Sequence, residues 1–322
     1  MIKSKLKNRN ISQEDVFNLS ELFKLMKPRV MSLVIFTCAV GLLMAPNIIP
    51  SKDAIIGIIL VSIGAGAAGA LNMWWDSDID FIMSRTSSRP IPEGRITDSQ
   101  ALSFGIFLTF FSVMLLGLFA NYLSASLLAG TIFFYVVVYT IFLKRKTPQN
   151  IVIGGAAGAL PPVIGWAVAT NSVGLESILM FALIFFWTPP HFWALCLMTK
   201  NDYLKSGIPM LTETHGETTT RKYIFIYSVI LLIPSALISF TSIGGIIYLL
   251  SIIPLNVIFF YLVISLYRND RNDKTLKEKR ERQLFLYSIF FLFAHFLVLL
   301  LEYFTKFFIP MYSQITEGLI WF

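Results

Sequence analysis

The sequence predicts an all-α, polytopic membrane protein with about nine transmembrane helices. Three observations predict this fold class: an apolar composition, a series of long uncharged runs and a one-sided distribution of basic residues. Of the 322 residues, 56% are hydrophobic and 14% are charged, whereas a soluble domain carries about 25% charged residues. The mean hydropathy is +0.70, and the length leaves little room for soluble domains besides the spans.

The uncharged runs define the individual spans, because a helix needs about 20 apolar residues to cross the hydrocarbon core of a bilayer. Two of the runs are 45 residues long, so each must hold a pair of spans. The first of them breaks at Asn121-Tyr122 and the second near Ser242–Gly245. In chain order the runs are 30–50, 54–75, 99–143, 151–170, 177–199, 223–267 and 283–301, which gives nine spans.

Basic residues orient the chain, since cytoplasmic connections are enriched in Lys and Arg. With the N-terminus in the cytoplasm, the segments on that side hold 24 of the 26 Lys and Arg residues, and only Lys52 and Lys306 fall outside them. Those segments are 1–29, 76–98, 144–150, 200–222 and 268–282. We expect the last of them to be a solvated loop. Topology therefore accounts for the net charge of +7 without a nucleic-acid partner.

The same interpretation of the sequence divides the chain into three parts. We expect a cytoplasmic segment at 1–29, one transmembrane domain at 30–304 and a short tail at 305–322. The Lys-rich N-terminus lacks the apolar stretch and cleavage site of a secretory signal and matches an organelle transit peptide poorly. A multi-pass protein of the bacterial inner membrane is the localisation that these features favour.

The stretch NMWWDSDID at 72–80 places carboxylates directly after the second span. Continued as a helix, it puts Asn72, Asp76 and Asp80 on one face because they are four residues apart, whereas Asp78 points elsewhere. Ionised groups at a membrane helix end are costly and usually functional. Carboxylate and amide oxygens suit Mg²⁺, which commonly bridges to a substrate phosphate. The alternative is a helix cap or a solvated loop.

Basic residues that could bind an anion lie on the same side of the membrane. Arg85 and Arg89 follow the acidic stretch, Lys144 opens the KRK sequence at 144–146, and Lys205 lies beside Asp202. Arg is suited to bidentate phosphate contacts. A diphosphate with Mg²⁺ would use both sets of charges, although topology alone could also explain the cations.

Five segments then resemble the intramembrane UbiA-type prenyltransferases, and within them the protohaem IX farnesyltransferases, the haem O synthases. They cover most of the chain in order. The segments are LMKPRV at 25–30, NMWWDSDIDFIMSRTSSRPIPEGRI at 72–96, LKRKTPQNIVIGGAAGALPPVIGWA at 143–167, FFWTPPHFWAL at 185–195 and DYLKSGIPML at 202–211.

The resemblance implies that the spans surround a central cavity closed by the cytoplasmic loops 76–98 and 200–222, which form an active site facing the cytoplasm. It implies farnesyl diphosphate and haem B as substrates, with haem O and diphosphate as products. Haem O serves haem–copper oxidases, so haem A synthase or a terminal oxidase assembly is a candidate partner. The metal ligands would be Asn72, Asp76, Asp80 and Asp202, and the diphosphate ligands Arg85, Arg89, Lys144 and Lys205.

His191, in WTPPHFW, is the candidate haem contact. It follows two prolines inside a span, where a broken helix would line the cavity. The alternative is a histidine satisfied within the helix bundle, which is also the role we expect for His295, while His215 is expected to be a polar loop residue. One departure from the family pattern concerns the second acidic motif. Its usual second aspartate is Ser206 here, which makes that metal site less complete.

Three other functions compete with this one. The first is the same fold with another aromatic acceptor, such as a hydroxybenzoate or other quinone precursor, a naphthoate or a chlorin. The second is an ion-coupled transporter, which would place its carboxylates near the bilayer midplane. The third is a scaffold that delivers haem to oxidases without catalysis.

Overall fold

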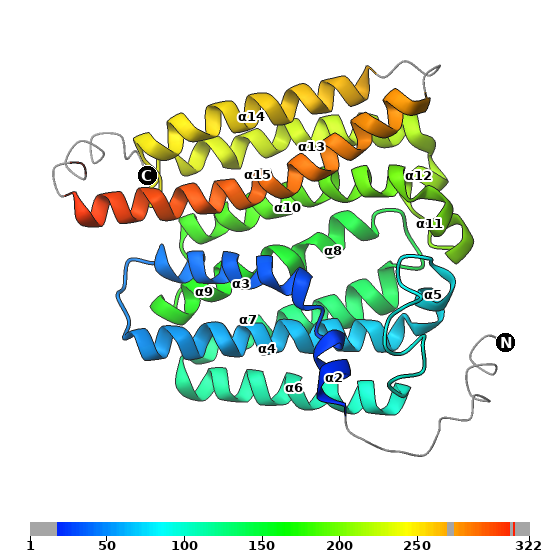
Figure 1. Cartoon of the computed structure of the whole chain (residues 1–322). Coiled ribbons are helices and arrows are strands. Elements are labelled where there is room, and N and C mark those ends of the chain that lie inside the picture. Colours follow the sequence, from blue (N-terminus) through cyan, green and yellow to red (C-terminus); the bar gives the residue numbers. More distant parts are fainter. Residues whose placement is uncertain (1–17, 269–273, 310–311, 313–322) are drawn as a thin grey trace.

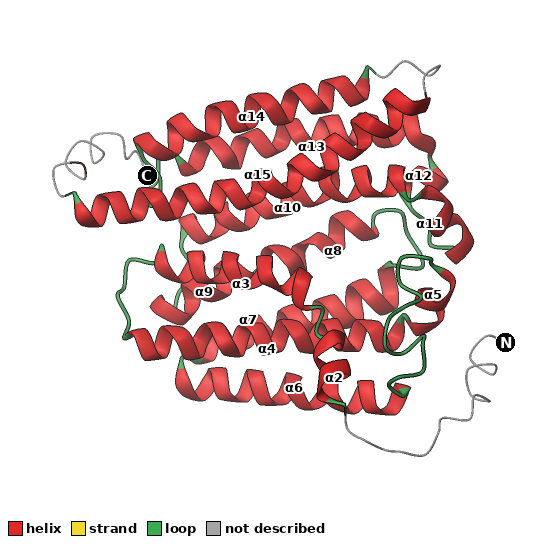
Figure 2. Ribbon diagram, viewed as in Figure 1, coloured by secondary structure: helices red, strands yellow, loops and turns green. Residues whose placement is uncertain are grey.

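The computed structural model describes residues 18–268, 274–309 and 312, and in these ranges it is a bundle of helices (Figures 1 and 2). Eight helices are long and apolar enough to cross a membrane, or nine if the bent pair at the start is counted as one more span. This confirms the predicted fold class. In chain order the helices are α2 Leu19–Leu25, α3 Pro28–Leu43, α4 Ser51–Trp75, α5 Ser77–Ile82, α6 Asp98–Phe119, α7 Tyr122–Phe133, the π-helix η1 Phe134–Leu143, α8 Asn150–Ala159, α9 Pro161–Thr170, α10 Leu175–Met198, α11 Lys200–Ser206, α12 Leu211–Thr214, α13 Gly216–Ile238, α14 Ile246–Tyr267 and α15 Lys274–Phe308.

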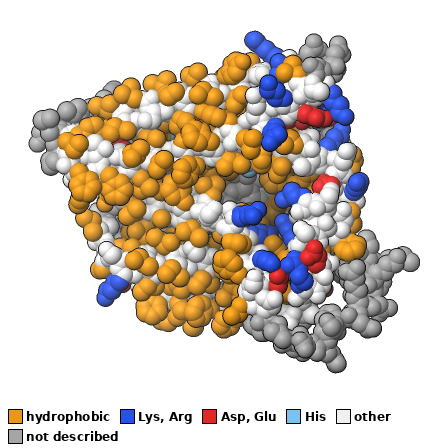
Figure 3. Space-filling view, in the orientation of Figure 1, with side chains coloured by type: hydrophobic (Ala, Val, Ile, Leu, Met, Phe, Trp, Pro, Cys, Tyr) orange, Lys and Arg blue, Asp and Glu red, His pale blue; other side chains and the backbone are white. Residues whose placement is uncertain are grey.

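The two ends of the bundle differ in charge. The short helices α5, α11 and α12 lie together at one end, which also carries the basic connections (Figure 1). Lys, Arg, Asp and Glu side chains gather at that end, and apolar side chains cover the body beside it (Figure 3). We call it the charged end. The described parts of the basic segments therefore share one side of the bundle, as the sequence predicts, while which side faces the cytoplasm stays a prediction.

Side-chain caps place helix ends inside the long apolar runs. Where the first run breaks, the Asn121 side chain accepts a hydrogen bond from the Ser124 backbone N–H at 2.8 Å and so begins α7. Its amide also donates to the Ala167 carbonyl at 2.8 Å, which ties α7 to α9. At the start of α6, Thr97 and Gln100 form a reciprocal capping box.

Small residues let the helices approach closely. A Cβ at Gly41 would collide with the Pro162 backbone, and one at Gly165 with the Cys38 carbonyl. These two glycines hold α3 and α9 together in the way that small residues do in membrane bundles. Cys38 and Cys196 are both buried and unpaired.

Helix ends differ from the predicted spans in two places. At the N-terminal side, α2 and α3 meet at an angle of 60°, and Lys27 between them adopts the left-handed conformation with φ 55°. At the C-terminal side, α15 begins at Lys274. The expectation of a solvated loop at 268–282 is therefore wrong for residues 274–282, because Glu281 is buried against Arg221 of α13. Residues 269–273 lie outside the described residues.

Candidate active site

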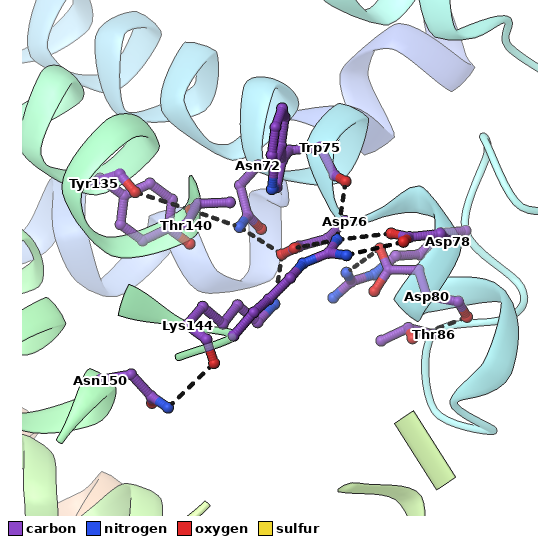
Figure 4. Close-up of polar contacts among 12 residues, drawn as sticks. Asn72, Trp75, Asp76, Asp78, Asp80, Thr86, Tyr135, Thr140, Lys144 and Asn150 are labelled. Atoms are coloured by element: carbon purple, nitrogen blue, oxygen red, sulfur yellow. Dashed lines mark hydrogen bonds and ion pairs between the residues drawn. The ribbon is translucent and has the colours of Figure 1, made fainter. Parts of the chain in front are cut away.

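Asn72, Asp76 and Asp80 form a buried polar group where α4 ends and α5 begins. All three are almost fully shielded from solvent, and the Asp80 backbone N–H donates to the Asp76 carbonyl at 2.8 Å, so the helical path nearly continues through the motif. Asp78 binds Arg145 through two hydrogen bonds of 2.7 and 2.9 Å. The same guanidinium lies 3.7 Å from Asp76 Oδ1, so it pairs with both carboxylates. Figure 4 shows Asn72, Asp76, Asp78 and Asp80 with their polar contacts.

The Asn72 amide connects three parts of the chain. Its oxygen accepts a hydrogen bond from Lys27 Nζ at 2.5 Å. Its nitrogen donates to Asp76 Oδ2 at 2.8 Å and to Thr140 Oγ1 at 3.0 Å. Because amide oxygen and nitrogen are both used, the side chain is fixed in one orientation (Figure 4).

The π-helix η1 aims Thr140 and Lys144 at this group. The Thr140 hydroxyl donates to the Tyr135 carbonyl at 2.8 Å, and the Lys144 backbone N–H to the Tyr139 carbonyl at 2.8 Å. The backbone bond of Lys144 spans five residues, one more than in an α-helix, and π-helical turns recur at functional sites. Lys144 Nζ pairs with Asp76 Oδ2.

Asp80 is held by the loop that follows α5. Arg89 Nη1 lies 2.6 Å from Asp80 Oδ2, and the Thr86 hydroxyl donates to the Asp80 carbonyl at 3.1 Å. Each buried carboxylate of the motif is therefore paired with cations: Asp76 with Lys144 and, at 3.7 Å, Arg145, and Asp80 with Arg89.

Asp202 lies on α11 and touches the same loop from the other side. Its carboxylate accepts the Ser84 hydroxyl at 2.5 Å. This bond, followed by backbone N–H groups of Arg85 and Ser84, lowers the pKa of Asp202. Arg85 and Lys205 are exposed around it, and Ser206 is half-buried. The structure thus joins the two predicted active-site loops through Asp202.

Asn72, Asp76 and Asp80 suit Mg²⁺ only if they offer an oxygen atom that accepts no hydrogen bond. Asp76 Oδ1 is buried and accepts no hydrogen bond; Arg145 Nη2 lies 3.7 Å from it. No three His, Cys, Asp or Glu residues gather as a metal site within the described residues, so Asp202 does not join Asp76 and Asp80 there. Two carboxylates and an amide are nevertheless a sufficient protein ligand set for Mg²⁺, which usually adds waters and substrate phosphates.

An apolar cavity of about 150 Å³ begins beside the polar group. Lys27 and Tyr135 line it on the polar side, and the remaining lining comes from α3, α4, α7, α8 and α9. The other lining residues are Val30, Met31, Val34, Val61, Ala65, Ala68, Gly69, Leu128, Thr131, Ile132, Ala157, Gly158, Pro161 and Ile164. Polar side chains next to an apolar cavity suit an amphiphilic ligand.

His191 lies on α10 against α15. Its ring stacks between Trp187 at 4.3 Å and Phe285 at 5.0 Å, and its Nδ1 is 2.7 Å from the Ser288 hydroxyl. The helix is unbroken from Leu175 to Met198 in spite of its two prolines, so the expected break is not there.

Of the other histidines, His295 bonds Ser235 across helices at 3.0 Å, as predicted, and His215 is exposed.

Three residues that contact the predicted site residues were missed from the sequence: Lys27, Thr140 and Ser84. Lys27 carried a usable signal, because Lys-Pro in LMKPRV marks a helix start. Arg145 was expected as an anion ligand in the basic KRK sequence, and the structure pairs it with Asp78 and Asp76. Thr140 and Ser84 carried none, since a lone hydroxyl beside an apolar run has no distinctive spacing.

Comparisons with known proteins identify the family of the chain. Residues 34–289 match the model of the UbiA prenyltransferase family. The protein named Protoheme IX farnesyltransferase from Pelagibacter ubique (strain HTCC1062) is 57% identical over 94% of this chain and 99% of its own length. Its namesake from Paracoccus denitrificans (strain Pd 1222) is 53% identical over 87% of this chain and 92% of its own.

Solved structures share the fold. A digeranylgeranylglyceryl phosphate synthase superposes with a TM-score of 0.72 at 19% identity, covering 87% of this chain and 98% of its own. A UbiA homologue from Archaeoglobus fulgidus bound to DMAPP and Mg²⁺ gives 0.63 at 17% identity, covering 87% and 99%. The match to the family model and the identity to the curated relatives, each over most of the chain, lead to one conclusion: this multi-pass membrane protein belongs to the UbiA prenyltransferase family.

Proposed function

We propose that the protein transfers the farnesyl group of farnesyl diphosphate to a vinyl group of haem B, with addition of water, to give haem O and diphosphate. The observation that carries the proposal is the buried group Asn72, Asp76 and Asp80, with its cations, beside an apolar cavity. The polar group suits the diphosphate and the cavity suits a prenyl chain. The relatives named Protoheme IX farnesyltransferase support the choice of acceptor.

Asn72, Asp76 and Asp80 would hold Mg²⁺, with Asp202 approaching when the loops close over the substrate. A bound Mg²⁺ would neutralise negative charge on the diphosphate as it leaves. The unused Asp76 Oδ1 and the homologue solved with DMAPP and Mg²⁺ support this assignment. Lys144 and Arg89, which now neutralise the carboxylates, would then turn to the phosphate oxygens, assisted by Arg85 and Lys205.

The reaction needs no protein nucleophile. The allylic C–O bond breaks and its electron pair leaves with the diphosphate, while the cations stabilise the developing charge. The vinyl π electrons form the new C–C bond to the farnesyl cation. Water adds to the resulting carbocation next to the porphyrin and releases one proton to solvent. The apolar cavity walls keep water away from the first cation.

His191 would contact the haem. Its Nδ1 is engaged by Ser288, which leaves Nε2 as the atom for haem iron or for a haem carboxylate. In metal-binding histidines, the ring nitrogen that does not bind the metal is usually fixed by a hydrogen bond.

We further infer a location in the bacterial inner membrane, with the charged end and the active site facing the cytoplasm, and haem A synthase or an oxidase assembly as recipients of the product.

Among the competing functions, an ion-coupled transporter would hold its carboxylates near the bilayer midplane. Asp76 instead caps the end of the 25-residue helix α4, beside the basic loops, which favours an enzyme acting on a diphosphate.

The test is a reaction with purified protein in nanodiscs. Haem B and farnesyl diphosphate are supplied with Mg²⁺ or with EDTA, and porphyrin products are identified by mass spectrometry. A metal-dependent gain of one farnesyl group plus water is expected. Product formed from a hydroxybenzoate but not from haem would move the assignment to another acceptor, and farnesylated haem formed equally in EDTA would refute the metal assignment.

A further inference from the structure

A second cavity, of about 800 Å³, lies at the charged end, between the end of α10 and the first turns of α11, α13 and α15. It is separate from the carboxylate group, because its lining includes none of Asn72, Asp76, Asp80 or Lys144. Its walls are charged rather than apolar, with Lys200 on α11, Glu217 on α13 and several ionisable residues of α15.

The acidic residues of the wall are mostly neutralised within it. Glu217 accepts Lys277 Nζ at 2.5 Å and Arg221 Nη2 at 3.2 Å, and Lys200 Nζ lies 3.6 Å away. Glu281 is buried and pairs with the same Arg221 at 3.4 Å. These contacts form a fixed network that joins α11, α13 and α15.

Three cations of the lining remain available. Lys274, Lys279 and Arg282 belong to the cavity, and none has an ion-pair partner among residues 18–268 and 274–309. Among the lining residues that the structure describes, only Glu278 opposes them. Three cations against one carboxylate leave an excess of two positive charges, which suits a ligand with two carboxylates.

The cavity also has an apolar wall, formed by the two helices that hold His191. Leu197 and Met198 of α10 and Leu286 of α15 line it. Met198 follows His191 by seven residues, so the two share a face of α10 about 10 Å apart along the axis. Leu286 is adjacent in sequence to Phe285, which stacks on His191. A flat aromatic ligand with acidic groups on one edge matches this layout.

We propose that the cavity binds the two propionate groups of the porphyrin substrate, with Arg282 and Lys279 as their main partners and Lys274 as a further one. The proposal rests on the proposed function, since haem is the substrate there. Protohaem carries its propionates and its vinyl groups on opposite edges. With the propionates held at α15, the vinyl groups lie on the edge of the porphyrin that faces away from α15.

The test is a spectrophotometric titration of haem B into the full chain in zwitterionic nanodiscs. The probe that removes the charges is the dimethyl ester of haem B. Wild type should bind haem B at least about tenfold more tightly than the ester, because two charge-assisted contacts are lost. The variant K279Q/R282Q should lose about tenfold in haem affinity and leave binding of the ester unchanged. The matched control is Lys222→Gln, an exposed lysine at the charged end outside the cavity.

Two further measurements separate this proposal from the proposed function. The KM for farnesyl diphosphate should stay within twofold in K279Q/R282Q while the KM for haem rises. Equal binding of haem and ester by wild type, or unchanged haem affinity in the variant, would overturn the propionate site while leaving the transferase intact. A wild type that makes no farnesylated haem would instead refute the proposed function. An effect of the variant seen only in nanodiscs with anionic lipid would assign the cavity to a lipid headgroup and overturn the proposal.

Discussion

Asp76 and Asp78 are two residues apart, yet they meet different surroundings. Asp76 is fully buried and bonded to Asn72 and Lys144, whereas Asp78 pairs with Arg145 at the surface. We predict that Asp76→Asn lowers turnover by at least about 10²-fold, because a neutral amide cannot balance a metal ion or orient the cations. Asp78→Asn should lower turnover less than about fivefold, the scale of a lost exposed ion pair. Rates of farnesylated haem formation measure both.

The two asparagine variants also provide the folding control. Each keeps the size of its side chain, so thermal unfolding in detergent should be similar for both. Equal activities of Asp76→Asn and the wild type would remove Asp76 from the metal site. A loss of activity accompanied by a fall in unfolding temperature would point to a structural role.

Lys27 is the residue that links the polar group to the apolar cavity. Its Nζ is 2.5 Å from Asn72 Oδ1 and its side chain lines the cavity, so it lies where the prenyl chain would join the diphosphate. We predict that Lys27→Gln raises the KM for farnesyl diphosphate about tenfold, the value of one charge-assisted contact. Lys24→Gln is the matched control, since Lys24 is exposed and pairs with Glu21. Equal KM values for both variants would contradict a phosphate contact at Lys27.

The spacing of Asn72, Asp76 and Asp80 could be read from the sequence, because residues four apart on a helix share a face whatever surrounds them. The contacts of Lys27 and Thr140 could not. The contact of Lys27 depends on its left-handed backbone conformation, and the contact of Thr140 depends on the π-helical turn before Lys144. Both features arise from the packing of whole helices, and the local residues do not encode them.

Helices α13 and α15 are joined by a buried ion pair that no hydropathy pattern reveals. The uncharged runs located the spans because the bilayer excludes charge, but the first turns of α15 contain seven charged residues between Lys274 and Arg282. They are helical, since Glu281 packs against Arg221 and Lys277 against Glu217. Tertiary pairing extended the helix beyond the apolar run.

This pair allows a prediction about the stability of the bundle. Glu281→Leu leaves the buried Arg221 with Glu217 as its remaining partner, so we expect a loss of about 1–3 kcal/mol and a lower unfolding temperature in detergent. Glu278→Leu, one turn earlier on the same helix and exposed, should change it little. The double variant Arg221→Leu/Glu281→Leu should recover part of the loss, because it leaves no lone buried charge. Equal unfolding temperatures for Glu281→Leu and Glu278→Leu would show that the pair does not join the helices.

At the scale of the whole molecule, charge asymmetry connects topology to function. The positive-inside rule predicts that the basic segments at the charged end orient the chain in the membrane, and these segments also supply the cations around the carboxylate group and the second cavity. A diphosphate and a porphyrin dicarboxylate would thus both be drawn to the same end of the bundle. The alternation of spans brings this about, since every second connection returns to that end (Figure 1).

The orientation itself can be measured with two matched cysteine variants. Ser51 and Ser99 are both exposed in the first turn of a helix, α4 and α6, at opposite ends of the bundle. The native Cys38 and Cys196 are buried and should not react. Since 24 of the 26 basic residues lie in segments assigned to the cytoplasm, we expect a membrane-impermeant maleimide to label Ser51→Cys in intact spheroplasts and Ser99→Cys only after permeabilisation. The reverse pattern would place the active site on the outer side of the membrane, and labelling of both variants before permeabilisation would contradict an orientation with these two ends on opposite sides.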